Sequence, residues 1–216
     1  LGATKMDRPE WIAVTADGWV YCALTHNSRR GAEGQPGVDA ANPRAVNTMG
    51  HVLRWKEDGD LDGTTFAWNH FVLAGDPANE REEARGNVNG DAFANPDGLW
   101  VDARGVVWIQ TDRGAPASGK GETARLGNNM MLAADPNTGE VRRFLVGPRG
   151  CEITGATATP DGRTLFVNIQ HPGEPPGARS DPADPARHSC WPGGPGTRPR
   201  SATVVVRRRD GGLIGT

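Results

Sequence analysis

The chain of 216 residues is long enough to bury one sizeable core, and its 36% hydrophobic and 23% charged residues are typical of a globular domain. Its mean hydropathy of -0.56, with no long apolar run, excludes a membrane-spanning helix. A net charge of -2 with no basic stripe argues against nucleic acid as a partner.

A hairpin pattern recurs three times along the chain. It consists of an apolar strand, a tight turn and a second apolar strand, and it covers residues 10–25, 97–112 and 154–169. When the three copies are aligned, their turns superpose at glycines, where a positive φ lets antiparallel strands reverse. The sequence therefore predicts three β-hairpins, with turns at Gly18, Gly105 and Gly162.

Further strands are predicted after each hairpin, at residues 51–55, 129–147 and 202–212. The second of these segments contains another hairpin around its DPNTGE turn. Repeated four-stranded antiparallel units with unequal loops between them are typical of a β-propeller, whereas a β-sandwich would not need the same hairpin to recur. We therefore predict an all-β fold of antiparallel propeller blades, about three to four of them in this chain.

Residues 1–216 are predicted to form one domain, the C-terminal part of a longer protein. About three or four blades cannot close a ring, because typical propellers have about four to eight, so the remaining blades would come from the missing part or from another chain. The Pro- and Gly-rich segment 172–200 is predicted to be an exposed loop insertion. An odd number of cysteines indicates neither a disulfide framework nor a Cys-rich zinc site.

Acidic residues occupy matching positions in the three hairpins. Glu10 lies seven residues before Asp17, and Asp97 lies seven residues before Arg104, so both acids have the same place relative to the turn. Glu152 precedes the third hairpin by two residues, on the same face of its strand. The first strand of each blade lines the channel of a propeller, so these carboxylates would converge. Crowded acids need a cation, and their oxygens suit calcium or iron(III).

Some acids have an ordinary alternative role. Asp17 and Asp161 lie in ADG and PDG turns, where aspartate caps a bend, and we interpret both as turn residues. For Glu10 the alternative is an exposed surface position. Asp112, at the end of the second hairpin, could support the metal ligands or cap a loop.

Other residues near these acids could assist them. No pair of histidines has metal-ligand spacing, and His171 is the best placed of them for a supporting role. Arg8 and Arg149 each lie close in sequence to a predicted metal ligand. Because arginine forms bidentate hydrogen bonds with phosphoryl oxygens, both are candidates for binding substrate phosphate.

Seven ordered blocks of the sequence resemble the PhoX-type alkaline phosphatases: MDRPEWIAV, VYCALTHNSRRG, DAANPRAVNTMGHVLRW, NPDGLWVDARGVVWIQTD, GNNMMLAADPNTGEVRRFLVGP, GCEITGATATPDGRTLFVNIQHPGE and RPRSATVVVRRRDGG. The resemblance implies a bacterial propeller enzyme that hydrolyses small phosphate monoesters with calcium and iron(III). It implies export by the twin-arginine route to the periplasm or the outside of the cell. It also implies a longer protein, whose N-terminal part carries an iron-binding cysteine.

By motif, the resemblance implies metal-ligand roles for Glu10 of RPEW and Glu152 of GCEITG. The assignment of Asp97 of NPDGLW as a metal ligand rests more on its register in the repeat and on the similar aspartate of gluconolactonase-like calcium propellers. The sequence departs from the family pattern at His26, where asparagine is expected. We therefore expect a metal-dependent alkaline phosphatase. The alternatives are a calcium-dependent lactonase-like propeller hydrolase and a non-catalytic propeller fragment that acts as a binding module.

Overall fold

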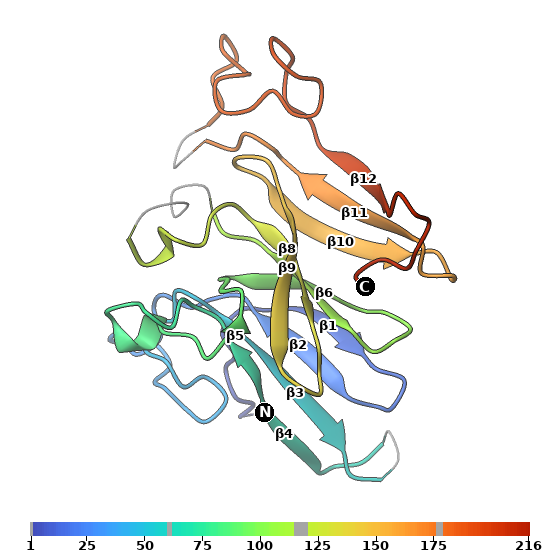
Figure 1. Ribbon diagram of the computed structural model, residues 1–216. Helices are drawn as coiled ribbons and strands as arrows, with labels where there is room; N and C mark the ends of the chain where they lie inside the picture. The colour runs from blue at the N-terminus through green and yellow to red at the C-terminus, as the bar shows by residue number, and fades with distance from the viewer. Residues whose placement is uncertain (1, 60–61, 115–120, 176–178) are drawn as a thin grey trace.

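The computed structural model describes residues 2–59, 62–114, 121–175 and 179–216. In these ranges the chain forms twelve β-strands in three sheets, together with the short 3-10 helices η1 (Glu82–Ala84) and η3 (Gly121–Thr123). Figure 1 shows the three sheets following one another along the molecule. No helix in the described part of the chain is long and apolar enough to cross a membrane. The predicted all-β fold of repeated blades is confirmed.

The first sheet has the strand order β1-β2-β3-β4, and all its neighbours are antiparallel. Its strands are β1 (Pro9–Val14), β2 (Val20–Leu24), β3 (His51–Glu57) and β4 (Phe66–Leu73). The hairpin β1-β2 turns at Gly18, whose φ of 88° is the predicted positive value. The sequence did not indicate β4, because Asn69 and His70 interrupt its apolar pattern.

The middle sheet has the strand order β5-β9-β8-β7-β6. Its strands are β5 (Asn89–Gly90), β6 (Pro96–Val101), β7 (Val107–Thr111), β8 (Met130–Ala134) and β9 (Glu140–Val146). One pairing departs from the predicted antiparallel pattern, since β5 runs parallel to β9. This pairing forms because the loop before β6 passes along the outer edge of the sheet. Gly90 has a φ of 123°, and a side chain there would collide with the Val141 carbonyl.

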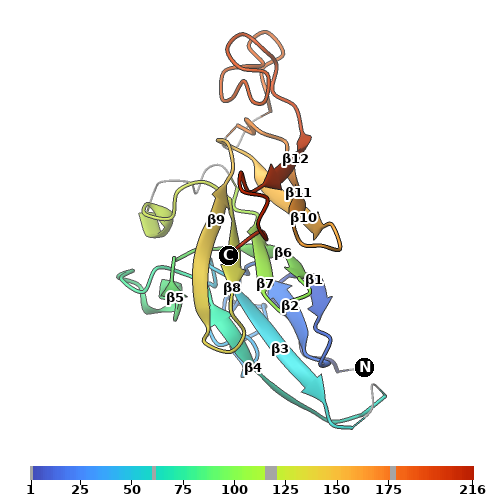
Figure 2. The same cartoon turned by 45° about the vertical axis from the view of Figure 1, so that its right-hand side comes forward.

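The third sheet has the strand order β10-β11-β12. Its strands are β10 (Glu152–Ala158), β11 (Thr164–Gln170) and β12 (Ala202–Arg207). The described part of segment 172–200 contains no strand, and it projects from this sheet in Figures 1 and 2. Most of its described residues are exposed or half-buried, but Trp191 packs against the neighbouring apolar core.

Two apolar cores join the three sheets. Alternate residues of β7 point to opposite faces of the middle sheet, so Ile109 enters one core and Trp108 the other. The first core includes Tyr21 and Val52 of the first sheet, and the second includes Leu165 of the third. Strand β6 contacts both β1 and β10. The edge strands β1 and β10 therefore lie on either side of β6, the edge strand of the middle sheet, as the strands that line a propeller channel do.

Candidate functional site

The strands β1, β6 and β10 are preceded by the same backbone arrangement. In each sheet a residue with positive φ lies two positions before an acid. These residues are Arg8 (φ 51°), Asn95 (φ 56°) and Gly150 (φ 64°). The left-handed conformation redirects the chain into the strand, so the acid stands near the start of the strand in every sheet. The acids placed in this way are Glu10, Asp97 and Glu152.

Three carboxylates meet where the middle and third sheets adjoin. Single oxygen atoms of Asp97, Asp112 and Glu152 all lie within 4.8 Å of one another, and we call these residues the acid cluster. Asp97 is 7% exposed and Glu152 is 9% exposed. The structure thus brings Asp97 and Glu152 together, and it places Asp112 in the same cluster rather than at a distance from it.

The acid cluster carries negative charge that the protein leaves largely uncompensated. Burial, a hydrogen bond with Glu152 and the charges of Glu10, Glu152 and Asp112 raise the pKa of Asp97 from 3.8 to about 7. Burial and the charge of Asp112 also raise the pKa of Glu152. Such shifts show that full ionisation of the group is unfavourable. A cation bound by the same oxygens would relieve this cost.

Neighbours on the third sheet hold the carboxylate of Glu152. The Gln170 Nε2 atom donates a hydrogen bond of 2.6 Å to the Glu152 Oε2 atom. The His171 Nε2 atom lies 3.3 Å from the same oxygen, and its Nδ1 atom lies 3.8 Å from an oxygen of Glu174. The predicted neighbour His171 is therefore in contact with Glu152. Only its position beside His171, at the end of an apolar strand, could have pointed to Gln170.

Glu10 takes part in a separate contact beside the acid cluster. The Arg8 Nη2 atom donates a hydrogen bond of 2.9 Å to the Glu10 Oε1 atom, and the Arg8 Nη1 atom lies 3.4 Å from the His26 Nδ1 atom. Glu10 lies outside the acid cluster, yet its charge helps to raise the pKa of Asp97. Partial burial and the charge of Arg8 lower the pKa of His26, which favours a neutral imidazole.

The second phosphate candidate, Arg149, is differently placed. Its side chain is exposed, and its carbonyl oxygen accepts a hydrogen bond of 2.9 Å from the backbone N–H of Gly173. It belongs to the turn that leads into β10, three residues before Glu152. Within the described ranges the structure brings Arg8 into contact with a predicted ligand, but not Arg149.

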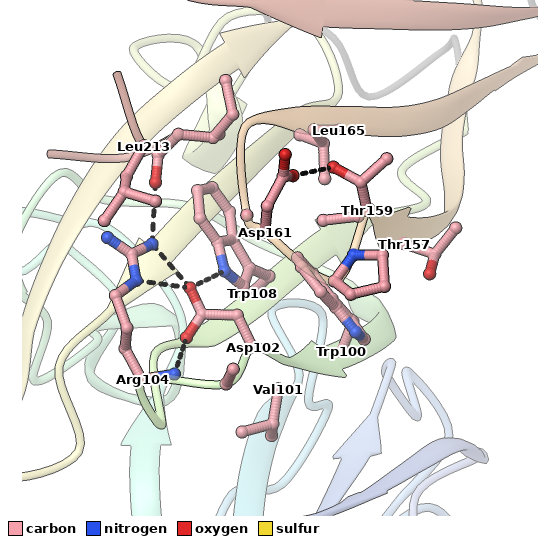
Figure 3. Close-up of a pocket in the computed structure, with 15 residues that line it drawn as sticks. Trp100, Val101, Asp102, Arg104, Trp108, Thr157, Thr159, Asp161, Leu165 and Leu213 are labelled. Atoms are coloured by element: carbon pink, nitrogen blue, oxygen red, sulfur yellow. Dashed lines mark hydrogen bonds and ion pairs between the residues drawn. The ribbon is translucent and has the colours of Figure 1, made fainter. Parts of the chain in front are cut away.

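A cavity of about 290 Å³ lies between the turns β6-β7 and β10-β11, at the ends of these strands that are far from the acid cluster. Figure 3 shows that its charged groups are already paired. Asp102 accepts hydrogen bonds from Arg104 at 2.6 Å and from the Trp108 indole at 3.2 Å, and Asp161 accepts one from Thr159 at 2.5 Å. Ligand-binding chemistry is therefore concentrated at the acid cluster, and we place the candidate site there.

Comparisons with known proteins show which family the chain resembles. The family model described as alkaline phosphatase PhoX matches residues 1–173. Among solved structures, Pseudomonas fluorescens PhoX in complex with vanadate, a transition state analogue, matches with a TM-score of 0.88 and 48% sequence identity. The match covers 99% of this chain but only 36% of the solved chain. A search of curated proteins gave no match.

Proposed function

Because this chain belongs to the alkaline phosphatase PhoX family, we propose that it supplies part of the metal site of an enzyme that hydrolyses phosphate monoesters. Its three sheets match part of a propeller protein. The observation that carries the proposal is the meeting of Asp97, Asp112 and Glu152 within 4.8 Å. The vanadate complex of the solved relative supports phosphate chemistry for the family fold.

The donor set fits hard cations. Carboxylate oxygens are the ligands that calcium prefers, and they also suit iron(III). The raised pKa of Asp97 reflects crowded carboxylates that resist full ionisation, and a bound cation would offset this cost. The acid cluster would hold the metals, with Glu10 beside it. A metal bound there would act as a Lewis acid that polarises the phosphoryl group and neutralises its charge.

Arg8 is the side chain best placed to bind the phosphoryl oxygens. Its guanidinium is half-exposed, and the bond to Glu10 fixes its direction. A planar guanidinium can donate two parallel hydrogen bonds to phosphate, and such donors stabilise the charge that develops in phosphoryl transfer. Glu10 would then have two roles, since it orients Arg8 and adds negative charge beside Asp97.

The supporting residues fix the carboxylates. Gln170 donates to the Glu152 Oε2 atom, and His171 lies beside the same oxygen, so both contacts orient this carboxylate. Outer contacts of this kind orient metal ligands. We therefore assign Glu152 the role of ligand and His171 a supporting role.

The remaining proposals concern the whole protein. The chain spans 36% of the solved relative, so we propose that the other blades and the rest of the metal site belong to a longer protein. Small phosphate monoesters would be its substrates. We further propose export by the twin-arginine route to the periplasm or the outside of the cell, which the upstream reading frame would test by encoding such a signal or lacking one.

The activity is tested with the full-length protein after reconstitution with calcium and iron(III). We expect hydrolysis of p-nitrophenyl phosphate that a chelator abolishes and added metal restores, and no hydrolysis of an aryl lactone. Hydrolysis of the lactone alone would establish the lactonase-like alternative. A protein that hydrolyses neither compound would support the binding-module alternative. Either of these two results would overturn the phosphatase proposal.

A further inference from the structure

Asn95 has an unusual backbone conformation for a residue that is not glycine. Its φ is 56°, it is 5% exposed, and it comes directly before Pro96 at the start of β6. Asparagine tolerates the left-handed region better than most residues, but the conformation still needs support from its surroundings. The hydrogen bonds of Asn95 provide that support.

The side chain of Asn95 reaches from the middle sheet to the first. Its Nδ2 atom donates to the carbonyl oxygens of Thr25 and Thr48, at 3.3 Å in each case. Its backbone N–H donates to the Met49 carbonyl at 2.7 Å. These three bonds join residue 95 to the loops that follow β2 and precede β3.

The carbonyl of Asn95 faces the acid cluster. It accepts a hydrogen bond of 3.0 Å from the backbone N–H of Asp112, and Asp97 follows two residues later in the chain. On the other side, the N–H of Thr25 donates to the Arg8 carbonyl at 3.1 Å. A chain of hydrogen bonds thus runs from Arg8 through Thr25 and Asn95 to Asp112.

Of the three equivalent left-handed positions, only residue 95 uses its side chain to join two sheets. Gly150 has no side chain, and Arg8 directs its guanidinium to Glu10 and His26. We propose that Asn95 is a positioning residue, which fixes Asp97 and Asp112 at a set place relative to Arg8 so that metal and phosphate can be bound together. The expected effect on catalysis rests on the proposed function. The positioning of Asp97 and Asp112 rests on the hydrogen bonds alone.

Two variants separate the parts of this role. Asn95→Gly retains the left-handed conformation but loses both side-chain bonds. Asn95→Asp also tolerates this conformation, but it faces the two carbonyl oxygens with a carboxylate instead of a donor. If the added negative charge at position 95 were the main effect, Asn95→Asp would bind cations more tightly. If the positioning of Asp97 and Asp112 is lost, the variant binds them more weakly. Asn137→Asp, in the exposed turn between β8 and β9, is the matched control.

The experiment titrates calcium into the metal-free full-length protein by calorimetry, below the melting temperature of each variant, and then measures kcat and KM with p-nitrophenyl phosphate. Both variants at position 95 should bind calcium about 10-fold to 100-fold more weakly, the range seen when outer contacts of metal ligands are removed. Their kcat should fall, and Asn137→Asp should match the unchanged protein in both measurements.

Calcium affinity at the unchanged level in both variants, or tighter binding by Asn95→Asp, would overturn the inference even if melting temperatures fall. These results are distinct from failure of the proposed function. If the unchanged protein binds calcium but does not hydrolyse the ester, the phosphatase proposal fails, and a loss of calcium affinity at position 95 would still support the positioning role.

Discussion

Single residues show how the acid cluster is held in place without being neutralised. The amide of Gln170 is a neutral donor to Glu152, and Asp97 shares a hydrogen bond with another acid of the cluster, Glu152. The nearby cation Arg8 is engaged with Glu10. These contacts order the side chains of the cluster, and a bound cation would relieve the crowding of acids that remains.

Glu152→Gln tests the charge of one ligand. The amide has nearly the same size as the carboxylate, but it carries no negative charge, so the full-length protein should lose bound metal and at least about 100-fold in kcat while remaining folded. Metal content, kcat and circular dichroism would be measured together. Glu140→Gln on the exposed part of β9 is the control and should leave all three unchanged. Full activity of Glu152→Gln would show that Glu152 is not a ligand.

The raised pKa of Asp97 makes the free energy of unfolding of the metal-free protein depend on pH. Because the pKa is 3.8 ordinarily and about 7 in the folded chain, the folded state favours protonated Asp97. This group contributes stability that is fully present below pH 3.8 and is lost as the pH rises through about 7. Asp97→Asn should remove that contribution to the pH dependence.

The measurement is urea unfolding of both metal-free proteins across this pH range. Burial lowers the pKa of His51 to about 4, and this residue acts in the opposite direction over part of the range. Since both proteins contain His51, its contribution cancels in the difference between them. Unfolding free energies that differ by a constant amount at every pH would show that Asp97 does not titrate as stated.

The positions of Glu10, Asp97 and Glu152 near strand starts could be predicted from the sequence, because two of these acids have a fixed distance to a turn glycine. The membership of Asp112 in the acid cluster could not, because it depends on how two sheets pack. The bond from Gln170 depends on the register of β11 against β10, and a bulge interrupts that pairing between Thr154 and Ala156.

Among the elements, the segment after β12 holds two sheets together. The side chain of Ile214 is 4% exposed and belongs to the core between the middle and third sheets. Its N–H donates to the Gly162 carbonyl at 3.0 Å, and its own carbonyl accepts from Arg104 at 2.7 Å. The chain end thus connects the turn of β6-β7 with the turn of β10-β11.

Ile214→Ala should lower the free energy of unfolding by about 2 to 4 kcal/mol, because it removes buried methyl and methylene groups and leaves a cavity. The neighbouring Leu213 is 37% exposed, so Leu213→Ala should cost less than about 1 kcal/mol. Urea unfolding of both variants compares the two effects. Equal losses would contradict a specific role for Ile214 in joining the sheets.

Among the secondary-structure elements, the three hairpins could be predicted from the sequence, because each combines a turn glycine with two apolar strands. It did not predict β4, in which Phe66 and Trp68 are exposed. It also did not predict β5, since a pairing of two residues leaves no periodic pattern. Elements defined by their own periodicity could be predicted, and those defined by a neighbouring strand could not.

The molecule as a whole has an apolar face that its own sheets do not cover. On β4, Phe66 is 53% exposed and Trp68 is 40% exposed, and on β1 Ile12 is 59% exposed. A groove of about 460 Å³ runs over Leu53, Trp55, Phe66 and Trp68. Where one described sheet adjoins another, the corresponding apolar faces are buried in the two cores. This is the face on which we expect another blade to pack.

A double variant, Phe66→Ser with Trp68→Ser, tests this expectation in two proteins. In the 216-residue chain Phe66 is 53% and Trp68 is 40% exposed, so the double variant should lower the free energy of unfolding by no more than about 2 kcal/mol. In the full-length protein the same change should cost at least about 3 kcal/mol, because large aromatic groups would leave a core. Equal changes in both proteins would show that no blade covers this face.

The arrangement of strands also has a kinetic consequence. Apart from β5, each sheet pairs strands that follow one another in the chain, whereas the acid cluster draws residues from two sheets. Local hairpins close before distant surfaces meet, so we expect the cluster to assemble late in folding. Calcium should then slow unfolding much more than it speeds refolding, which stopped-flow tryptophan fluorescence would measure. Metal would thus act mainly on the lifetime of the finished fold, and an equal effect on both rates would indicate early assembly instead.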